Sequence, residues 1–262
     1  MLIGKPGPGK TAIAEATAPG VEVRGRDLAA DLMGRMTFTG FFFFLMTGRE
    51  PTETQRFFLD LVLVAIAEHG LTPSAVAARM TYAAAPDALQ GAVAAGILGA
   101  GSVILGASEL CAAMLADAMA RIDGGGKADA VVADIAREIH GRGEKLPGFG
   151  HPIHKPVDAR AERILALADE KKAAGRAIDL ARRFAPAAEK EWGRKLPMNV
   201  SMAIAACLVD VGFPAAMVKA VPILARTAGL LAHLAEEKER PVGFLMASAA
   251  EGAVTYDGGG KP

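Results

Sequence analysis

The sequence has few cysteines and few aromatic residues, and this scarcity limits what the protein can be. Its 262 residues include two cysteines, one tryptophan and two tyrosines. Cys111 and Cys207 lie far apart, each inside an apolar run. That placement suits buried thiols in a reducing compartment better than a disulfide or a metal site. We therefore expect a cytoplasmic protein without a bound metal.

The sequence also lacks an excess of charge of either sign. Lys plus Arg and Asp plus Glu both number 29, so the formal net charge is zero. Because the chain has no surplus of basic residues, its charge does not indicate nucleic acid or an anionic membrane as a partner. Hydrophobic residues make up 52% and charged residues 22%, which indicates a core-forming globular chain. Its length fits one large domain, or a large domain with a smaller one.

Long apolar segments are scarce too. The first residues are rich in Gly, Pro and Lys and lack the apolar stretch of a secretory signal peptide. We therefore expect no signal peptide. The uncharged run from Gly91 to Ser108 reaches the lower length limit of a membrane span. Because it is rich in glycine and alanine, we expect a helix buried in a core or a subunit interface; a membrane span is the alternative.

Strand patterns are almost absent, and helical spacing of apolar residues dominates, which predicts an all-α fold of about ten helices. The predicted helices cover residues 52–70, 72–85, 91–108, 109–123, 128–143, 159–175, 177–193, 199–212 and 215–239. Residues 11–25 suggest a small β-hairpin with a Pro-Gly turn. Residues 146–158 are a loop rich in proline and glycine.

Near its start the chain contains a short motif of nucleotide-binding proteins. Gly4 to Thr11 match the phosphate-loop pattern G-x-x-x-x-G-K-[ST]. Such a loop follows a buried strand and opens a helix, and no strand pattern precedes Gly4. Pro6 and Pro8 also remove two of the backbone N–H donors that would hold phosphate. We expect an N-terminal arm here, and an ATPase remains the alternative.

Charged groups gather on the Pro/Gly loop that precedes a predicted helix. The stretch GFGHPIHKPVDAR carries two histidines, Lys155, Asp158 and Arg160. Glycines let a ligand approach the backbone closely, and these cations suit a substrate with carboxylates. The alternative is a solvated turn at a helix start.

Two further arginines have unusual surroundings. Arg226 lies inside the apolar run PILARTAGLLAH, where a charge must be paired or must bind an anion. A buried salt bridge and an anion site both satisfy that requirement. Arg240 stands before Pro241, where the helix stops, and it is either a functional or an ordinary surface residue.

Several segments, in chain order, resemble the citrate synthase superfamily. KLPGFGHPIHKPVDARAERI resembles its P-G-[FY]-G-H-x-[VIL]-x-[KR]-x-x-D-P-R loop, and AIAEHGLTPSAVAARM resembles its A-E-H segment. Residues 21–52, 196–214 and 225–243 resemble three other family segments. The resemblance runs from about Thr11 to the C-terminus, and its loop is most similar to compact citryl-CoA lyase-like members.

This resemblance implies a helical homodimer, or a higher homo-oligomer. The implied large domain comprises residues 1–107 and 213–262, and the implied small domain comprises residues 108–212. The two domains would close over a polycarboxylate and coenzyme A. The implied substrate-binding residues are His69, Arg160, Arg226 and, reaching the other subunit's site, Arg240. His151 matches the histidine that handles the proton of the substrate oxygen. The implied coenzyme A contacts are Leu146, Pro147, Gly148, Gly150 and Lys195.

Two positions depart from the family pattern. The H-G-G-A-x-E stretch reads ILGASE here, with Ile104 in place of the histidine. The aspartate that follows N-V is replaced by Ser201. Isoleucine cannot stabilise an enol, and a serine hydroxyl is no base at neutral pH without a partner. The groups that enolise acetyl-CoA are therefore missing, while the carboxylate-binding arginines remain.

This selective loss leads to a hypothesis of retro-Claisen cleavage. A citryl-CoA-like 3-hydroxyacyl-CoA would give acetyl-CoA and a 2-oxo acid such as oxaloacetate. His151 would take the hydroxyl proton, and Ser201, Glu109 or backbone amides would help the enolate. The alternative is a catalytically altered protein that binds a CoA ester or polycarboxylate without turnover.

Overall fold

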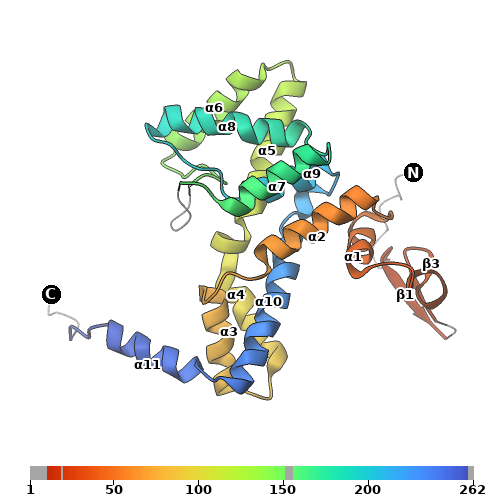
Figure 1. The fold of residues 1–262 in the computed structure, drawn as a ribbon, viewed down its shortest axis with the longest axis vertical. Helices are drawn as coiled ribbons and strands as arrows, with labels where there is room; N and C mark the ends of the chain where they lie inside the picture. The colour runs from red at the N-terminus through yellow and green to blue at the C-terminus, as the bar shows by residue number, and fades with distance from the viewer. Residues whose placement is uncertain (1–10, 19, 151–155, 259–262) are drawn as a thin grey trace.

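The computed structural model describes residues 11–18, 20–150 and 156–258. Eleven α-helices and one small sheet make up this part of the chain (Figure 1). The predicted all-α fold with a small β-hairpin is confirmed. The phosphate-loop pattern before Thr11, the turn residue Pro19 and the residues His151 and His154 lie outside the described residues.

The sheet lies at the N-terminal end of the described chain. β1 (Ala14–Thr17), β2 (Gly20–Val23) and β3 (Arg26–Asp27) are antiparallel in that order, so a third strand joins the predicted hairpin. Arg24 and Gly25 make the second turn with φ of 52° and 79°. A π-helical turn, Leu28–Leu32, follows the sheet. Val23, Leu32 and Phe44 form a small core beneath it.

Four helices follow the sheet: α1 (Phe38–Thr47), α2 (Glu53–Ala67), α3 (Pro73–Ala84) and α4 (Leu89–Leu105). α2 begins at a capping box between Thr52 and Gln55, which satisfies backbone N–H groups of its first turn. α1 was not predicted as a helix, because its run of consecutive phenylalanines hides the helical period. Of these, Phe43 and Phe44 are buried in the core.

α4 is not one straight helix. At Gly101 the backbone leaves helical geometry, with φ 54° and ψ −163°. Ala92, Gly96 and Leu105 are buried, but Leu98 and Val103 are exposed, so only one face of the expected buried helix is covered. Two helical stretches, Leu89–Asp123 and Ala215–Glu239, have the length and hydropathy of a membrane span, a weak criterion that core helices also meet.

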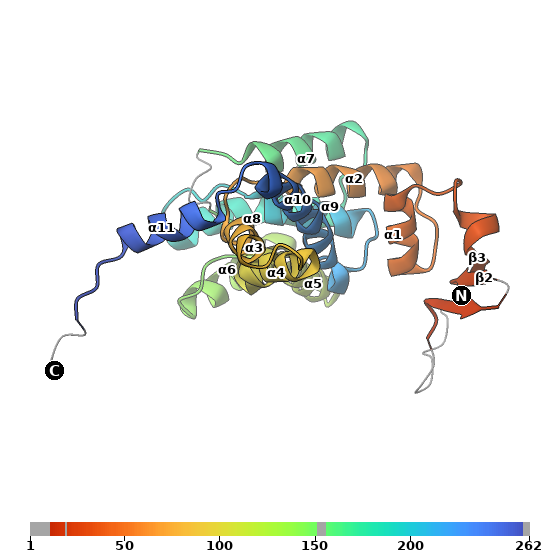
Figure 2. The same ribbon diagram turned by 90° about the horizontal axis from the view of Figure 1, so that it is seen from below.

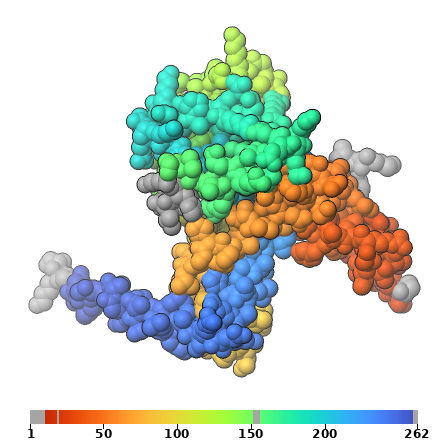
Figure 3. Space-filling view, viewed as in Figure 1, coloured from red at the N-terminus to blue at the C-terminus, as the bar shows by residue number. Residues whose placement is uncertain are grey.

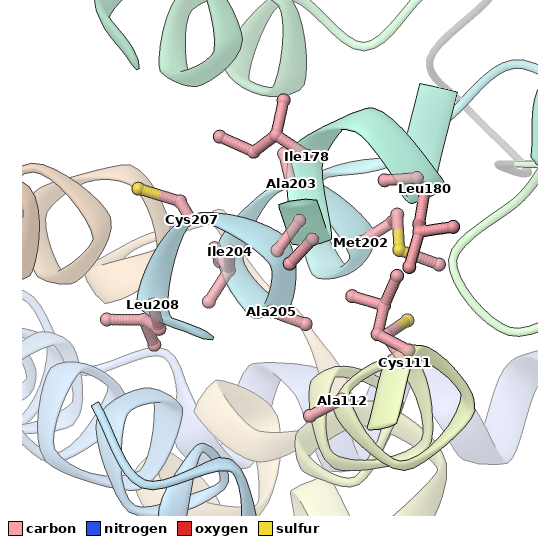
Figure 4. Packing of buried hydrophobic residues seen from close by; sticks show 14 of the residues in the cluster. Cys111, Ala112, Ile178, Leu180, Met202, Ala203, Ile204, Ala205, Cys207 and Leu208 are labelled. Carbon is pink, nitrogen blue, oxygen red and sulfur yellow. The ribbon is translucent and has the colours of Figure 1, made fainter. Parts of the chain in front are cut away.

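The next five helices form the main core: α5 (Ala107–Asp123), α6 (Ala128–Gly141), α7 (Ala159–Glu170), α8 (Arg176–Trp192) and α9 (Val200–Asp210). α9 lies at their centre, where Ile204 and Leu208 are buried among side chains of its neighbours (Figure 4). Cys111 and Cys207 are free and buried, as expected, and burial raises the pKa of both thiols to about 12.

A carboxylate fixes the far end of α9 to the start of α8. Asp210 accepts backbone N–H bonds from Gly175, Ala177 and Ile178 at 2.8–2.9 Å. These are the donors that a helix N-terminus leaves without partners, so Asp210 acts as a cap supplied by another helix.

The chain ends with α10 (Ala220–Glu239) and α11 (Gly243–Ala253). α10 packs on α3 and α4 through Leu230 and Leu234. α11, which was not predicted, projects from one side of the molecule and the sheet from the other (Figure 2), and in Figure 3 it stands clear of the body as an arm. Figure 1 groups α5–α9 at one end and α3, α4 and α10 at the other. The boundaries of the two domains stay a prediction.

Candidate functional site

A cavity of about 330 Å³ lies where α2, α4, α9 and α10 approach one another, and we call it the small cavity. Its polar lining includes His69, Ser108, Arg160, Asn199, Ser201 and Arg226. Its apolar lining includes Ile66, Ile104, Leu105, Val200, Ile204 and Pro222. The cavity thus brings together four predicted site residues and the substituted position 104.

Arg226 reaches this cavity from the middle of α10. It is 7% exposed, and its Nη1 has no hydrogen-bond partner in the described part of the chain. The nearest carboxylate, Glu68 Oε2, is 3.9 Å from that nitrogen. Burial lowers the pKa of Arg226, an effect that Glu68 partly opposes, but a guanidinium stays charged at neutral pH. A buried cation so weakly compensated is suited to bind an anion.

Glu68 also shapes the turn that carries His69. Its Oε1 accepts the backbone N–H groups of His69 and Gly70 at 2.8 and 2.6 Å. The same oxygen is 3.0 Å from Nε2 of His233 on α10. Burial raises the pKa of Glu68, but the hydrogen bonds from His233 and the backbone outweigh it and bring the pKa below its usual value. Glu68 therefore stays ionised beside Arg226.

Arg160 and the first turn of α9 share one carboxylate. Asp158, 1% exposed, accepts Nε and Nη2 of Arg160 at 3.0 and 2.9 Å. It also accepts the backbone N–H of Val200 at 3.0 Å. Burial raises the pKa of Asp158, but Arg160 and the backbone bonds bring it below its usual value. The charge of Arg160 is therefore already matched within the protein.

Ser201 lies in the first turn of α9. Asn199 caps the helix by accepting the N–H of Ser201 at 3.0 Å, and its amide donates to the carbonyl of Gly150 at 2.9 Å. No described side chain accepts a hydrogen bond from the Ser201 hydroxyl, so the described residues provide it with no base. A serine here can donate to a ligand at a helix N-terminus.

The loop predicted to contact coenzyme A is held against the segment that leads into α9. Gly150 donates to the carbonyl of Pro197 at 2.7 Å, and Asn199 donates to that of Gly148 at 2.9 Å. Gly148 has φ of 80°, and a Cβ there would lie 2.5 Å from Cβ of Met202. Gly148 is therefore required both by its backbone conformation and by the lack of room for a side chain. Leu146, two residues earlier, is buried.

A second cavity of about 780 Å³, which we call the large cavity, borders this segment. α7 and α8 form its walls, and Lys195 to Met198 line one side. Lys195, a predicted coenzyme A contact, thus lies at the large cavity. Pro147 and Gly150 come shortly before residues 151–155 in the sequence, and His151, the predicted proton acceptor, lies outside the described residues.

Two predicted catalytic or substrate-binding residues in the described chain line neither the small nor the large cavity. Glu109 on α5 pairs with Lys219 at 3.0 Å. Arg240, at the end of α10, lines a separate hollow together with Glu68 and His233. In the described part of the chain, no group of three or more His, Cys, Asp or Glu side chains could hold a metal ion.

Sequence reasoning missed a buried network next to the site. Arg79 on α3 pairs with Glu237 at 2.6 Å and Glu236 at 2.8 Å, and it donates to the carbonyl of Arg240 at 3.2 Å. Glu237 accepts the N–H groups of Val242 and Gly243, which start α11. An arginine between alanines in AVAARM was the available signal, as for Arg226.

Comparison with known proteins bears on the family and the fold. Residues 14–243 match the family described as "Citrate synthase, C-terminal domain". "Putative citrate synthase 2" of Mycobacterium tuberculosis is 32% identical over 213 residues, which cover 76% of this chain and 54% of that protein. Citrate synthase of Haloferax volcanii is 28% identical, covering 76% of this chain and 51% of that protein. The chain thus spans about half the length of the curated relatives it matches.

Among solved structures, one similar protein has nearly the same length. Citryl-CoA lyase from Hydrogenobacter thermophilus superposes with a TM-score of 0.80 and 29% identity, covering 97% of this chain and 95% of that one. ATP citrate lyase from Methanothrix soehngenii shares the fold, with a TM-score of 0.74 at 22% identity over 90% of this chain and 39% of that one. With the family match across most of its length, this chain belongs to the citrate synthase family.

Proposed function

We propose that this protein is a lyase that cleaves a carbon–carbon bond in a CoA thioester. The substrate is a citryl-CoA-like 3-hydroxyacyl-CoA, and the products are acetyl-CoA and a 2-oxo acid such as oxaloacetate. The observation that carries the proposal is the buried guanidinium of Arg226, without a hydrogen-bond partner for Nη1 in the described chain, in a cavity of substrate size. The similarity to citryl-CoA lyase over nearly both full chains supports it.

In this mechanism Arg226 binds the carboxylate of the 2-oxo acid portion, and His69 and Arg160 border it. His151 takes the hydroxyl proton, the bond between the second and third acyl carbons breaks, and its electron pair passes into the thioester enolate. Ser201 and the positive end of α9 stabilise the enolate oxygen. Ser201 is better placed than Glu109, because Glu109 is paired with Lys219 and does not line the small cavity. Protonation of the enolate gives acetyl-CoA.

The large cavity is the proposed site of coenzyme A. Lys195 would meet a phosphate group, and the backbone of residues 146–150 would contact the adenine. Arg182 pairs with Asp169 across the cavity wall, which leaves Lys195 as the cation without a carboxylate partner among the described lining residues. The reaction needs no metal, and we place it in the cytoplasm.

The proposed enzyme acts as a homodimer. Leu98 and Val103 on α4 are 80% and 88% exposed, and Phe244 and Leu245 on α11 are 70% and 67% exposed. A second copy of the chain would cover these exposed apolar groups of α4 and α11. Arg240, at the corner between α10 and α11, would then reach the partner's site.

The test is cleavage of citryl-CoA and smaller analogues by the purified protein. Acetyl-CoA is followed by chromatography and the 2-oxo acid by reduction with NADH. We expect turnover that falls about 100-fold or more in Arg226→Ala, because a buried ionic contact to substrate is lost. Arg163→Ala is the control, since Arg163 is exposed and pairs with Glu170. No cleavage of any thioester, or unchanged cleavage in His151→Ala, would refute the proposal.

A second candidate is a protein that binds a CoA ester or polycarboxylate without turnover. It is favoured by the described lining of the small cavity, which contains no carboxylate or cysteine side chain that could act as a base or a nucleophile. Calorimetry separates the two: tight binding of citrate or a CoA ester without any product supports this alternative.

A further inference from the structure

A buried ion pair lies at the corner where α10 ends and α11 leaves the body, at the end of the molecule opposite α5–α9 (Figure 1). Arg79 on α3 and Glu237 in the last turn of α10 are each 3% exposed, and they pair at 2.6 Å. Burial disfavours the charged form of both groups. Their mutual hydrogen bond and further partners outweigh this effect, so the pKa of Arg79 is raised and that of Glu237 is lowered. Both groups therefore stay ionised.

The guanidinium of Arg79 makes all its described hydrogen bonds to α10 and the residue that ends it. Its Nη1 is 2.8 Å from Oε2 of Glu236 and 3.4 Å from Nδ1 of His233. Its Nη2 donates to the carbonyl oxygen of Arg240 at 3.2 Å. The backbone N–H of Arg240 in turn donates to the carbonyl of Glu236 at 2.7 Å. Both peptide groups of Arg240 are thus held, one by its own helix and one by α3.

The chain is also fastened just after Arg240. Oε1 of Glu237 accepts the backbone N–H groups of Val242 and Gly243 at 2.9 and 2.7 Å. A Cβ on Gly243 would lie 2.5 Å from Cβ of Ala83, so the start of α11 lies directly against α3. One carboxylate therefore joins Arg79 on one side of Arg240 to the start of α11 on the other.

Apolar contacts already hold α10 on α3 without this ion pair. Leu230 and Leu234, earlier in α10, are buried together with Ala78 and Tyr82 of α3. A buried ion pair commonly adds no stability over apolar residues of similar volume. Its distinct effect here is on direction, because its hydrogen bonds fix the backbone on both sides of Arg240. The side chain of Arg240 is itself exposed.

We infer that Glu237 and Arg79 are positioning residues that direct Arg240 into the site of a second copy of this chain. This inference rests on the proposed lyase and its homodimer. In its own chain Arg240 does not line the small cavity, so a role in binding substrate requires the partner's cavity. An arginine on a fixed backbone loses less conformational freedom when it binds a carboxylate, which strengthens the contact.

The experiment uses mixed dimers, purified through a different affinity tag on each subunit. Arg226→Ala removes the site of the subunit that carries it, and Arg240→Ala deprives the partner's site of its arginine. A dimer of one Arg226→Ala and one Arg240→Ala subunit therefore keeps one complete site. We expect it to cleave citryl-CoA at about half the wild-type rate, whereas both symmetric variants are nearly inactive.

Glu237→Gln is then added to one subunit or the other. In the Arg226→Ala subunit, which supplies Arg240 to the complete site, it should lower kcat/KM about tenfold or more. In the Arg240→Ala subunit, which contains that site, it should change kcat/KM by less than about twofold. A purely structural role predicts the reverse, because damage would follow the chain that contains the site. Glu53→Gln, at an exposed position of α2, is the matched control and should have no effect in either subunit.

The outcomes separate this inference from the lyase proposal. If the wild type cleaves citryl-CoA but the mixed dimer does not, or if the loss follows the chain that contains the site, the inference is overturned and the lyase stands. A monomeric wild-type protein overturns it as well. If Glu237→Gln prevents folding, Arg79→Lys replaces it with the same expected results, because lysine keeps the charge but not the fork of donors.

If the wild type cleaves no thioester, the lyase proposal fails, and calorimetry with citrate decides the inference on the same mixed dimers. Binding that is about tenfold or more weaker only when Glu237→Gln lies in the Arg226→Ala subunit supports the inference. Equal affinity in both placements, or no binding of citrate, overturns it.

Discussion

Asp158 holds Arg160 in a side-on ion pair, with Nε 3.0 Å from Oδ1 and Nη2 2.9 Å from Oδ2. The same carboxylate receives the N–H of Val200, the first residue of α9. One buried side chain thus joins the start of α7, a guanidinium of the small cavity and the helix that carries Ser201. The position of Arg160 depends on this carboxylate as much as on its own helix.

Replacement of Asp158 by asparagine should therefore destabilise the protein. It leaves Arg160 without its counter-charge, and we expect a loss of about 2–3 kcal/mol in the free energy of unfolding, less than for a fully buried pair because Arg160 is partly exposed. Urea unfolding measures the loss. Asp169→Asn, in an exposed pair with Arg182, should change stability by less than about 0.5 kcal/mol. Equal effects of the two variants would contradict this role.

The carboxylate of Asp158 should also make the free energy of unfolding depend on pH in the acidic range. The pKa of Asp158 is lowered in the folded protein, so its contribution is present above the pKa of the unfolded chain and is lost as pH falls through the folded value. Glu68 and Glu237 act in the same direction. We expect the free energy of unfolding to fall below about pH 4, and less steeply in Asp158→Asn. Parallel pH profiles for both proteins would refute this assignment.

Glu68 lies close enough to Arg226 to compete with a bound carboxylate. Glu68→Gln keeps an oxygen for the N–H groups of His69 and Gly70 but removes the charge 3.9 Å from Nη1 of Arg226. We expect the Kd of a 2-oxo acid such as oxaloacetate to fall about two- to fivefold at low salt, and by less at high salt. Calorimetry measures this change. The control is Glu53→Gln in the first turn of α2, and weaker binding in Glu68→Gln would count against the competition.

Gly148 should not tolerate a side chain. Its φ of 80° disfavours any other residue, and an alanine Cβ would lie 2.5 Å from Cβ of Met202 and 2.8 Å from Sγ of Cys111. We expect Gly148→Ala to cost about 2 kcal/mol or more and to weaken coenzyme A binding. Gly141→Ala is the control, because its Cβ would meet no atom within 4 Å. Unfolding by urea and CoA titration report the two effects, and wild-type values in both would disprove the requirement.

The exposed apolar groups of α4 and α11 should matter for assembly. A charge at either place would oppose burial against a second copy, so Leu98→Glu and Phe244→Glu should shift the protein toward monomer. Sedimentation analysis measures the molecular mass. Val64→Glu, on α2 outside this surface, should leave it unchanged. A wild-type protein that is monomeric at micromolar concentration would rule out the proposed dimer.

The sequence predicted those parts of the fold in which local signals agree. α2 was predicted from the helical spacing of its apolar residues, and α9 from its apolar run. α11 was missed because Phe244 and Leu245 do not pack on the body, so no amphipathic pattern distinguishes it from a loop. The domain boundaries stay a prediction.

For the site, Arg226 was predictable because a charge inside an apolar run needs an explanation. Glu68 was not, since an acid in a turn next to a helix end is typical of an exposed surface. Its function depends on His233, which lies far away in the chain and meets it only when α10 packs on α2. Contacts of this kind arise from tertiary structure and have no local sequence pattern.

α9 is fixed at both ends, and this has a mechanical consequence. Its first turn borders the small cavity through Asn199 and Ser201, and about 16 Å further along, Asp210 holds the start of α8, which forms a wall of the large cavity. A packed helix does not stretch, so a displacement of one end is carried to the other. Residues 195–198 line the large cavity and lead directly into this first turn, so a ligand in either cavity acts on the same end of α9, and its effect can reach α8 through Asp210.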